Sequence, residues 1–422
     1  MPRDSVHTGL PLPRRAAFHE GAQKDSCDVL IVGAGPAGSS CAWGLQQAGL
    51  DTVILDKAVF PRDKICGGWI TPHVLGELQV DPFEYARGRV LQPITGFRTS
   101  RMGGTEVQTD YGKPVSYGIR RCEFDEFLLE RCGARVLQGT PLKSLESSGK
   151  CWVANDRLKA RLVVGAGGHF CPVARFMGAG SHKETAVTAQ EVEFEMNSFQ
   201  RSNCSIRADV PELYFCADMK GYGWCFRKQD FLNVGLGRLD LHALPSHVSN
   251  FLEFLKRSGK IRFELPAHFP GHAYLLYSST VRRIVDEGML LAGDAAGLAY
   301  SQSGEGIRPA IESGLLAAEA IIAARGNYTR ESLLRYQTLL AARFGLSGSD
   351  WTTAIGRHLP AHLVSLCARF LMASKWFSRH VVLDRWFLHR KEPGLNLPDH
   401  QRFVPTSFAS SKVEHSSQKL SV

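Results

Sequence analysis

Residues 28–38, DVLIVGAGPAG, decide the fold. The run begins with an apolar stretch that is typical of a buried strand. It continues into the pattern G-x-G-x-x-G, after which small or apolar residues recur at helical spacing up to Gly49. A second apolar run, 52–56, ends on Asp56. A strand, a glycine turn, a helix, a strand and an acid in this order predict an α/β fold with a Rossmann-like domain that binds a dinucleotide.

Each position in this unit has a physical role. Gly33 permits a tight turn, Gly35 lets the backbone approach a diphosphate, and Gly38 lets the helix pack closely on the strand. The first turn of the helix offers unpaired N–H groups and a partial positive charge to the phosphates. The carboxylate at the end of the second strand can bind ribose hydroxyls. The cofactor contacts predicted here are Gly33, Gly35, Pro36, Ala37, Gly38, Asp56 and Lys57.

A second turn favours FAD over NAD. Residues 290–297, LLAGDAAG, predict a short strand that delivers an acid to a glycine turn, and 303–321 predict a helix just beyond it. The acid can bind a ribityl or ribose hydroxyl, and the helix start can support the pyrimidine end of a flavin. Asp294 taken alone could also be an ordinary turn or capping carboxylate. The contacts predicted at this turn are Gly293, Asp294, Gly304, Gly306 and Ile307.

Three motifs resemble those of the flavoprotein hydroxylase fold. Residues 293–297 resemble its second FAD motif. Residues 121–125, RCEFD, resemble its R-x-x-F-D motif, which implies that Arg121 lies near the cofactor. The third motif is expected near 165–175, where Gly167 replaces the usual aspartate. The order of the motifs implies FAD, whereas the replaced aspartate leaves the docking of NAD(P)H open.

Two further segments narrow the resemblance. Residues 61–69, PRDKICGGW, and 221–228, GYGWCFRK, followed by 233–237, NVGLG, resemble the geranylgeranyl reductase family. This resemblance runs from about residue 27 to about residue 345. It implies an enzyme that uses reduced FAD to saturate double bonds of isoprenoid chains or other hydrophobic molecules. NAD(P)H or a reductase partner is then expected as the electron donor.

Alkene reduction suggests three catalytic residues. Hydride leaves the flavin, and the other carbon needs a proton, so Cys66 can stand beside the ring as a thiol donor or polarising group. Tyr222 and Trp224 can form an aromatic wall for the substrate. The alternatives are that Cys66 is a small buried hydrophobe and that both aromatics are ordinary core residues. Glu305 and Arg308 are either catalytic or solvated surface charges.

Two rival functions share this cofactor fold. The first is an FAD-dependent monooxygenase that hydroxylates a small hydrophobic molecule, and the second is a flavoprotein electron carrier that acts with a protein partner. The segments at 61–69 and 221–228 favour the reductase. A halogenase, a special case of the first rival, is expected to carry W-x-W, which this sequence lacks. The sequence also lacks C-x-x-C, which argues against a zinc site and against an iron–sulfur cluster. We expect no metal site.

The composition limits where the protein is expected to be located and which partners it is expected to bind. The 422 residues are 44% hydrophobic and carry a formal net charge of +9. No apolar stretch is long enough to predict a transmembrane helix, and the N-terminus lacks the apolar core of a secretory signal, so we expect a cytoplasmic protein. We expect no nucleic-acid partner. In 343–400 basic residues outnumber acidic ones beside Trp351, Trp376, Phe377, Trp386 and Phe387.

The patterns predict a Rossmann-like FAD-binding domain with an inserted antiparallel-sheet substrate domain and a C-terminal helical segment. The C-terminal helices either cap a substrate tunnel or rest on a bilayer through 346–392. The predicted parts are 1–26, disordered; 27–85, 116–180 and 281–345, FAD-binding; 86–115 and 181–280, substrate-binding; 346–399, helical; and 400–422, disordered.

Overall fold

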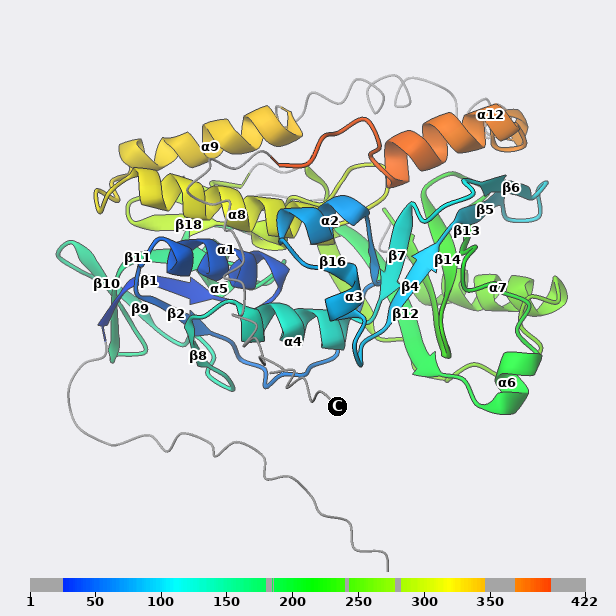
Figure 1. Cartoon of the computed structure of the whole chain (residues 1–422), viewed down its shortest axis with the longest axis horizontal. Helices are drawn as coiled ribbons and strands as arrows, with labels where there is room; N and C mark the ends of the chain where they lie inside the picture. Colours follow the sequence, from blue (N-terminus) through cyan, green and yellow to red (C-terminus); the bar gives the residue numbers. More distant parts are fainter. Residues whose placement is uncertain are drawn as a thin grey trace, which may run out of the picture.

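The computed structural model describes residues 26–179, 184, 186–239, 243–277, 282–345 and 369–395. Two large sheets lie side by side, with a small sheet between them (Figure 1). The sheet that contains β1 lies on the left of this view and the sheet that contains β14 on the right. The predicted segments 1–25, 346–368 and 396–422, Trp351 among them, lie outside the described residues.

The first sheet is the predicted dinucleotide-binding sheet. Its strand order is β17-β18-β11-β1-β2-β8, and β1 pairs in parallel with both β11 and β2. Val32 lies opposite Gly165 on one side and Leu55 on the other, so three chain segments turn at the same edge. β9 and β10 extend β11 as an antiparallel hairpin. The strands are β1 (Ser26–Val32), β2 (Thr52–Leu55), β8 (Arg135–Leu137), β9 (Leu145–Ser148), β10 (Cys151–Ala154), β11 (Leu158–Gly165), β17 (Val285–Asp286) and β18 (Met289–Leu291).

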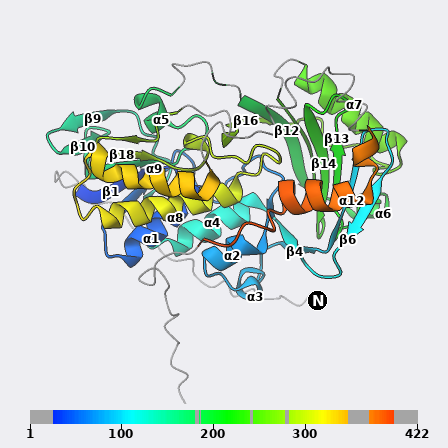
Figure 2. The ribbon, with the colours of Figure 1, turned by 90° about the horizontal axis from the view of Figure 1, so that it is seen from above.

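Helices α1, α8 and α9 form a layer beside this sheet (Figure 2). A side chain at Gly314 of α8 would lie 2.3 Å from the carbonyl oxygen of Ala37 in α1, so only glycine lets the two backbones touch. This contact brings the N-termini of α1 and α8 to one place. The helices of this part are α1 (Pro36–Gln47), α4 (Arg121–Arg131), α5 (Pro172–Phe176), α8 (Ile307–Ala323) and α9 (Arg330–Phe344), with the 3-10 turn η2 (Gly293–Ala295).

The second sheet is mixed, whereas the sequence predicts an antiparallel one. β5 pairs in parallel with β13, and the other pairs are antiparallel. The strands β5 and β6 precede the other five in the chain and join the sheet at its β13 edge. The strands follow the order β16 (Gly271–Leu275), β12 (Ala186–Glu195), β15 (Phe231–Arg238), β14 (Gly221–Lys228), β13 (Glu212–Phe215), β5 (Gly96–Arg101) and β6 (Val107–Asp110).

Both faces of the second sheet are covered, and this decides which side chains reach the site. Helix α7 (Leu244–Arg257) covers the outer face, where Phe251 packs against Gly223. The inner face points toward the first sheet and carries Trp224 and Phe226. Trp224 lies over Gly235, where a built Cβ would be 2.3 Å from the indole, so the glycine leaves room for the ring.

Smaller elements join the two sheets. The three-stranded sheet has the order β3-β7-β4 and lies in the middle of Figure 1. The loop 56–68 runs from β2 toward β3 and passes between the large sheets. These elements are β3 (Trp69–Ile70), α2 (Pro72–Glu77), α3 (Pro82–Tyr85), β4 (Leu91–Ile94), β7 (Ser116–Ile119) and α6 (Ser198–Ser202).

The described C-terminal segment, 369–395, is helical over much of its length. It contains α12 (Lys375–Phe377) and a π-helix (Ser378–Phe387). Phe387 packs against Trp69 and Tyr222 with ring centroids 5.7 and 5.3 Å away, so this segment closes one end of the inner face. No helix among the described residues is long and apolar enough to cross a membrane.

Candidate active site

One cavity of about 720 Å³ lies between the two large sheets. It extends from the glycine turn after β1 to the aromatic inner face of the second sheet, and its volume is in the range of ligand pockets. Every predicted site residue lines it except Gly38 and Gly293. Those two residues allow close packing behind the cavity wall. A side chain at Gly38 would meet the Gly33 carbonyl, and one at Gly293 would meet Ala37.

The end of the cavity beside β1 has the features of a diphosphate and ribose site. Gly35 is the N-cap of α1 and has no side-chain cap, which leaves the helix N-terminus open to a ligand. Asp56 Oδ2 accepts a hydrogen bond of 2.7 Å from Ala34 N, and its Oδ1 accepts one of 2.8 Å from Ala58 N. The acid after β2 is therefore held in place by backbone donors on both sides.

The second turn lines the same cavity through Asp294. Burial favours the neutral form of Asp294, but His272, Lys64 and Arg121 together hold the pKa of its carboxyl below the ordinary value. His272 Nε2 lies 3.7 Å from Asp294 Oδ2, and Lys64 Nζ lies 2.9 Å from the same ring nitrogen. Burial lowers the pKa of both Lys64 and His272. Asp294 is thus an ionised acceptor beside the start of α8.

Arg121 is buried in the cavity wall. It forms two hydrogen bonds of 2.8 Å to Asp125, which also lies 3.2 Å from Arg62. Burial disfavours the charged guanidinium, but Asp125 and Cys66 more than offset this, so the pKa of Arg121 is raised. The R-x-x-F-D motif therefore places a fixed positive charge close to Cys66.

Cys66 lies on the loop 56–68 with its main chain held from two strands of the second sheet. Its N–H donates to Oε1 of Glu191, and its carbonyl accepts a hydrogen bond of 3.2 Å from Asn233. Its Sγ accepts a hydrogen bond of 3.4 Å from Gly68 N. The thiol is partly exposed, and it lines the cavity rather than the interior of a core.

Two glutamates, the buried Glu191 and the partly buried Glu305, also line the cavity, and the sequence assigned a definite role to neither. Glu191 is 4% exposed, and burial raises its pKa to about 7. Burial likewise raises the pKa of Glu305 to about 7. Among the described residues, Oε2 of each has no hydrogen-bond partner. The surface interpretation of Arg308 is wrong, because Arg308 is fully buried and donates across 2.7 Å to Glu312. Glu305 is partly buried and lines the cavity.

The aromatic wall, formed by Tyr222 and Trp224, packs against the core of the second sheet and also lines the cavity. Trp224 Nε1 donates a hydrogen bond of 2.7 Å to Asn233 Oδ1. The Tyr222 hydroxyl donates to the Ser303 carbonyl, which connects the second sheet to the loop before α8. Burial keeps the pKa of Tyr222 well above its ordinary value, so this hydroxyl stays protonated. The two residues thus offer an apolar surface with satisfied polar ends.

These features fit FAD. The open N-terminus of α1 and the ionised Asp294 lie in one cavity, at separate places suited to a diphosphate and to a sugar-alcohol or ring end. The N-terminus of α8, with Gly306 as its N-cap and no side-chain cap, adds donors beside the second place. The residues that would contact the cofactor are those predicted from sequence, together with Lys64 and His272.

Sequence reasoning missed Lys64, His272, Glu191 and Asn233. Lys64 lies inside the quoted segment PRDKICGGW, so proximity to Cys66 was an available signal. Glu191 lies in the alternating run EVEFE, which is equally typical of a solvated strand face. Asn233 begins the quoted segment NVGLG, although no role was assigned to it. His272 has no local signal, and the sheet pairing brings both residues to the site.

Comparisons with known proteins agree with this geometry. A family model described as an NAD(P)-binding Rossmann-like domain matches residues 31–86. The menaquinone reductase of Mycobacterium tuberculosis is 30% identical over 347 residues, covering 76% of this chain and 81% of that protein. The digeranylgeranylglycerophospholipid reductase of Methanococcus vannielii is 26% identical over 334 residues, covering 75% and 83%.

Solved structures share the fold. A geranylgeranyl bacteriochlorophyll reductase-like protein from Thermoplasma acidophilum superposes with a TM-score of 0.72 at 21% identity, covering 87% of this chain and 98% of that one. A halogenase in complex with FAD has a TM-score of 0.60 at 17% identity, covering 87% and 86%.

The two nucleotide turns, the shared cavity and the shared fold define an FAD-dependent oxidoreductase. Within that class the chain belongs to the geranylgeranyl reductase family. The predicted fold, family and cofactor are thereby confirmed. The roles of the individual site residues and the domain boundaries stay predictions.

Proposed function

We propose that this enzyme reduces carbon–carbon double bonds of an isoprenoid chain or another hydrophobic substrate. The observation that carries the proposal is the single cavity, which joins both nucleotide turns to the Cys66 loop and the aromatic wall. When bound, reduced FAD supplies a hydride to one carbon of the double bond. Relatives named as reductases of menaquinone and of a geranylgeranyl lipid support a hydrophobic substrate.

The chain's own residues divide the remaining work. The turn at Gly33 to Gly38, with Asp56, holds the diphosphate and ribose. Asp294 and the start of α8 hold the sugar-alcohol and ring end. Tyr222 and Trp224 hold an apolar chain and exclude water from it. Cys66 stands beside the reacting carbons, where Arg121 polarises its thiol.

The electron donor is proposed to be NAD(P)H, which docks transiently, or a reductase partner. The sequence carries one complete G-x-G-x-x-G unit with strand and acid, and the FAD diphosphate occupies it in this proposal. A nicotinamide cofactor therefore has to reach the flavin without a Rossmann turn of its own. Stopped-flow reduction by NADH and NADPH distinguishes this route from a protein donor.

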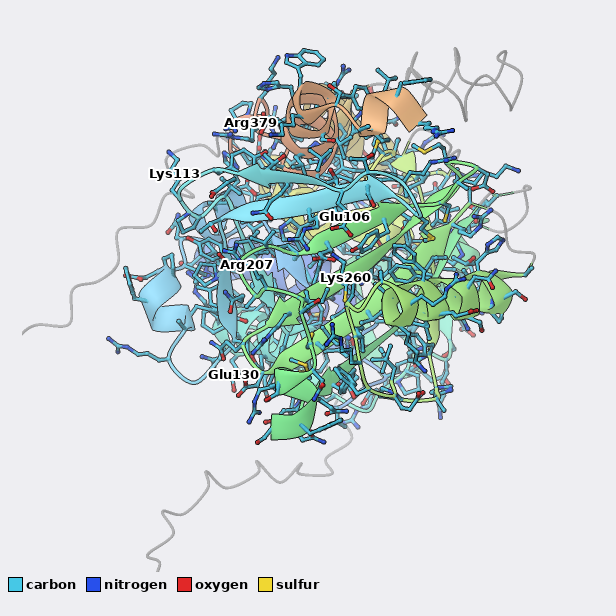
Figure 3. The ribbon with its side chains drawn as sticks, turned by 90° about the vertical axis from the view of Figure 1, so that its right-hand side faces the viewer. Glu106, Lys113, Glu130, Arg207, Lys260 and Arg379 are labelled. Carbon is cyan, nitrogen blue, oxygen red and sulfur yellow. The ribbon has the colours of Figure 1, made fainter. Side chains whose placement is uncertain are left out.

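We also propose that the C-terminal segment rests on an anionic membrane surface. Its described part exposes Phe370, Leu371 and Trp376, whose exposed fractions are 70%, 45% and 66%. Exposed basic residues lie in the same segment at Lys375 and Arg385. Lys113 and Arg379 lie at this end of the molecule and Glu130 lies at the other (Figure 3). Aromatic and basic side chains together are typical of an interfacial surface.

Vesicle binding tests the membrane surface. We expect Trp376→Ser to weaken cosedimentation with phosphatidylglycerol vesicles at least threefold. Phe199→Ser is the matched control, because Phe199 is an aromatic of similar exposure, 65%, on α6. Equal binding of both variants and the unsubstituted protein would contradict the proposal.

The reaction itself is tested by reducing the FAD-loaded enzyme without oxygen and then adding substrates. Reoxidation of the flavin by an isoprenoid alkene, with a saturated product found by mass analysis, supports the reductase. A strict need for oxygen, with oxygen incorporated into the product, would overturn it in favour of a monooxygenase. Reoxidation only by a protein partner would overturn it in favour of an electron carrier.

A further inference from the structure

Glu191 is a buried carboxyl group that the binding of FAD does not account for. It lies on β12 with its side chain on the inner face of the second sheet, where it lines the cavity. Its Oε1 accepts the N–H of Cys66, and its Oε2 has no hydrogen-bond partner among the described residues. A polar atom that is buried without a partner is costly, so its position calls for a functional explanation.

The charged groups around Glu191 are engaged elsewhere. Lys228 of β14 donates to Glu193 rather than to Glu191, and Lys64 of the loop 56–68 lies against His272. Tyr274 of β16, whose pKa burial raises, faces it as a neutral phenol. No ion pair to Glu191 occurs within the described ranges. The desolvation penalty is therefore largely uncompensated, which favours the protonated acid near neutral pH.

Protonated Glu191 can supply the proton that alkene reduction needs in addition to the hydride. Hydride addition to one carbon leaves the other carbon in need of a proton, and an acid with a pKa near the working pH is suited to give it. The carboxyl group lies at the same wall as Cys66 and the indole of Trp224. Gly235, which has no side chain, lies beneath both Trp224 and Glu191 and lets them share that wall.

We propose that Glu191 is the proton donor of the reaction and that its other oxygen at the same time positions the Cys66 loop. This inference rests on the proposed function. With reduced FAD bound, one carbon would receive a hydride, which is one proton with two electrons, and Glu191 would give H⁺ to the other carbon. A C–H bond forms at each carbon, the π bond is lost, and the flavin becomes oxidised. The Glu191 carboxylate then takes a proton from solvent after product leaves.

Glu305 is another acid of the cavity whose pKa is raised by burial, and its contacts give it a different role. Its Oε1 accepts a hydrogen bond of 2.8 Å from Arg308 N, in the first turn of α8. Its loop also carries Gly304 and Gly306, which are predicted to contact the cofactor. Glu305 therefore belongs to the structure that starts α8, whereas Glu191 belongs to the wall that carries Cys66.

The variant Glu191→Gln separates the two roles of this side chain. Glutamine keeps a carbonyl oxygen for the Cys66 N–H and cannot supply the proton. We expect E191Q to bind FAD and to be reduced normally, while reoxidation by an alkene slows at least 100-fold. Reoxidation by ferricyanide, which needs no proton at a carbon, should stay within threefold of the unsubstituted enzyme. Glu195→Gln is the control, because Glu195 lies on the same strand and is exposed.

A second readout does not depend on turnover. In FAD-loaded protein with ¹³C-labelled glutamate side chains, E191Q should lack one of the carboxyl resonances that titrate near neutral pH. Glu305, whose pKa burial also raises to about 7, gives another, which Glu305→Gln identifies. If E191Q loses no such resonance, Glu191 is ionised in the resting enzyme and the proposal is wrong. If E191Q reduces the alkene as fast as the unsubstituted enzyme, or if Glu305→Gln alone blocks the step, the proposal also fails.

The experiments distinguish failure of the proposed function from failure of the donor role of Glu191. An unsubstituted enzyme that reduces no alkene overturns the proposed function, and the donor role of Glu191 with it. An unsubstituted enzyme that reduces the alkene, accompanied by a fully active E191Q, overturns only the role of Glu191. A misfolded E191Q is recognised by its FAD absorbance and melting temperature, and Glu191→Asp, which keeps the acid, then takes its place. Activity in E191D but not in Glu191→Ala supports the donor role.

Discussion

Trp224 donates its indole N–H to Oδ1 of Asn233 across 2.7 Å, and this hydrogen bond ties the aromatic wall to the Cys66 loop. The amide nitrogen of the same asparagine lies 3.2 Å from the carbonyl oxygen of Cys66. Asn233 is fully buried between β14 and β12. One side chain therefore sets the positions of two groups that share one wall of the cavity.

Asn233→Ala should disturb the reaction more than the cofactor. It leaves the Trp224 N–H buried without an acceptor, which we expect to cost about 1–3 kcal/mol of unfolding free energy. It also frees the Cys66 carbonyl, so alkene reduction should fall at least tenfold while the FAD content stays near that of the unsubstituted enzyme. Asn203→Ala, at a more exposed asparagine that bonds a helix carbonyl, is the control. An N233A enzyme with normal activity would contradict the positioning role.

Cys66→Ala should leave the protein yellow and slow alkene reduction. The thiol lines the cavity beside Arg121, and Cys66 is not among the residues predicted to contact the cofactor. The measurement is the rate of flavin reoxidation by alkene in the reduced enzyme, with FAD content taken from the absorbance spectrum. Cys151→Ala is the control, because Cys151 lies on the β9–β10 hairpin. Full activity of C66A would remove Cys66 from the mechanism.

The glycine turns could be predicted because their function depends on neighbouring residues. Gly33 to Gly38 and Asp56 belong to one strand–helix–strand unit, and the parallel pairing of β1 with β2 places Asp56 against Ala34. The same holds for Asp294 and the start of α8. Local sequence was therefore sufficient to predict the fold, the family and the part of the cavity that would hold FAD.

The other half depends on pairings that no local pattern encodes. Glu191 and Asn233 meet Cys66 only because β12 and β15 pair and the loop 56–68 passes over them. The alternating acids of β12 are typical of a strand face that is exposed to solvent. In the structure, the face that carries Glu191 lines the cavity instead. Arg308 was ambiguous for a similar reason, since its partner Glu312 also accepts from Arg343, and only the packing of α8 on α9 brings these groups together.

Asp294→Ala should weaken FAD binding at least tenfold. The substitution removes an ionised acceptor at the second turn and leaves Lys64 and His272 without their nearby carboxylate. Fluorescence titration of the FAD-free protein with FAD measures the dissociation constant. Asp286→Ala is the control, because Asp286 pairs with Arg283 away from the cavity. Unchanged affinity in D294A would show that the second turn does not hold the cofactor.

Glu312→Ala should strongly destabilise the fold. Glu312 is fully buried and accepts from Arg308 and Arg343 across 2.7 and 2.6 Å. Its loss leaves two guanidinium groups without their main partner, and breaking a buried pair typically costs about 3–5 kcal/mol. Glu253→Ala, which removes an exposed partner of Arg257, should cost less than about 1 kcal/mol. Urea unfolding of both variants provides the comparison, and equal midpoints would contradict it.

Glu305→Gln should stabilise the FAD-free protein by an amount that grows with pH. Burial raises the pKa of Glu305 from 4.5 to about 7, so between these values the folded protein keeps a proton that the unfolded chain has released. Unfolding then releases a proton, and the Glu305 contribution to stability is complete below pH 4.5 and is lost as the pH rises through 7. Glutamine does not titrate, and its carbonyl can still accept from Arg308 N.

The free energy of unfolding of E305Q should therefore match the unsubstituted protein near pH 5, apart from a constant offset, and exceed it increasingly up to pH 8. At 1.36 kcal/mol per pKa unit, the change in the difference is on the order of 3 kcal/mol. Urea unfolding at four pH values in this range measures it, and taking differences cancels the opposite contribution of His73, His169 and His272, whose pKa values burial lowers. A difference that stays constant with pH would mean that Glu305 is ionised in the folded protein, and its position at the start of α8 would then require a cationic partner.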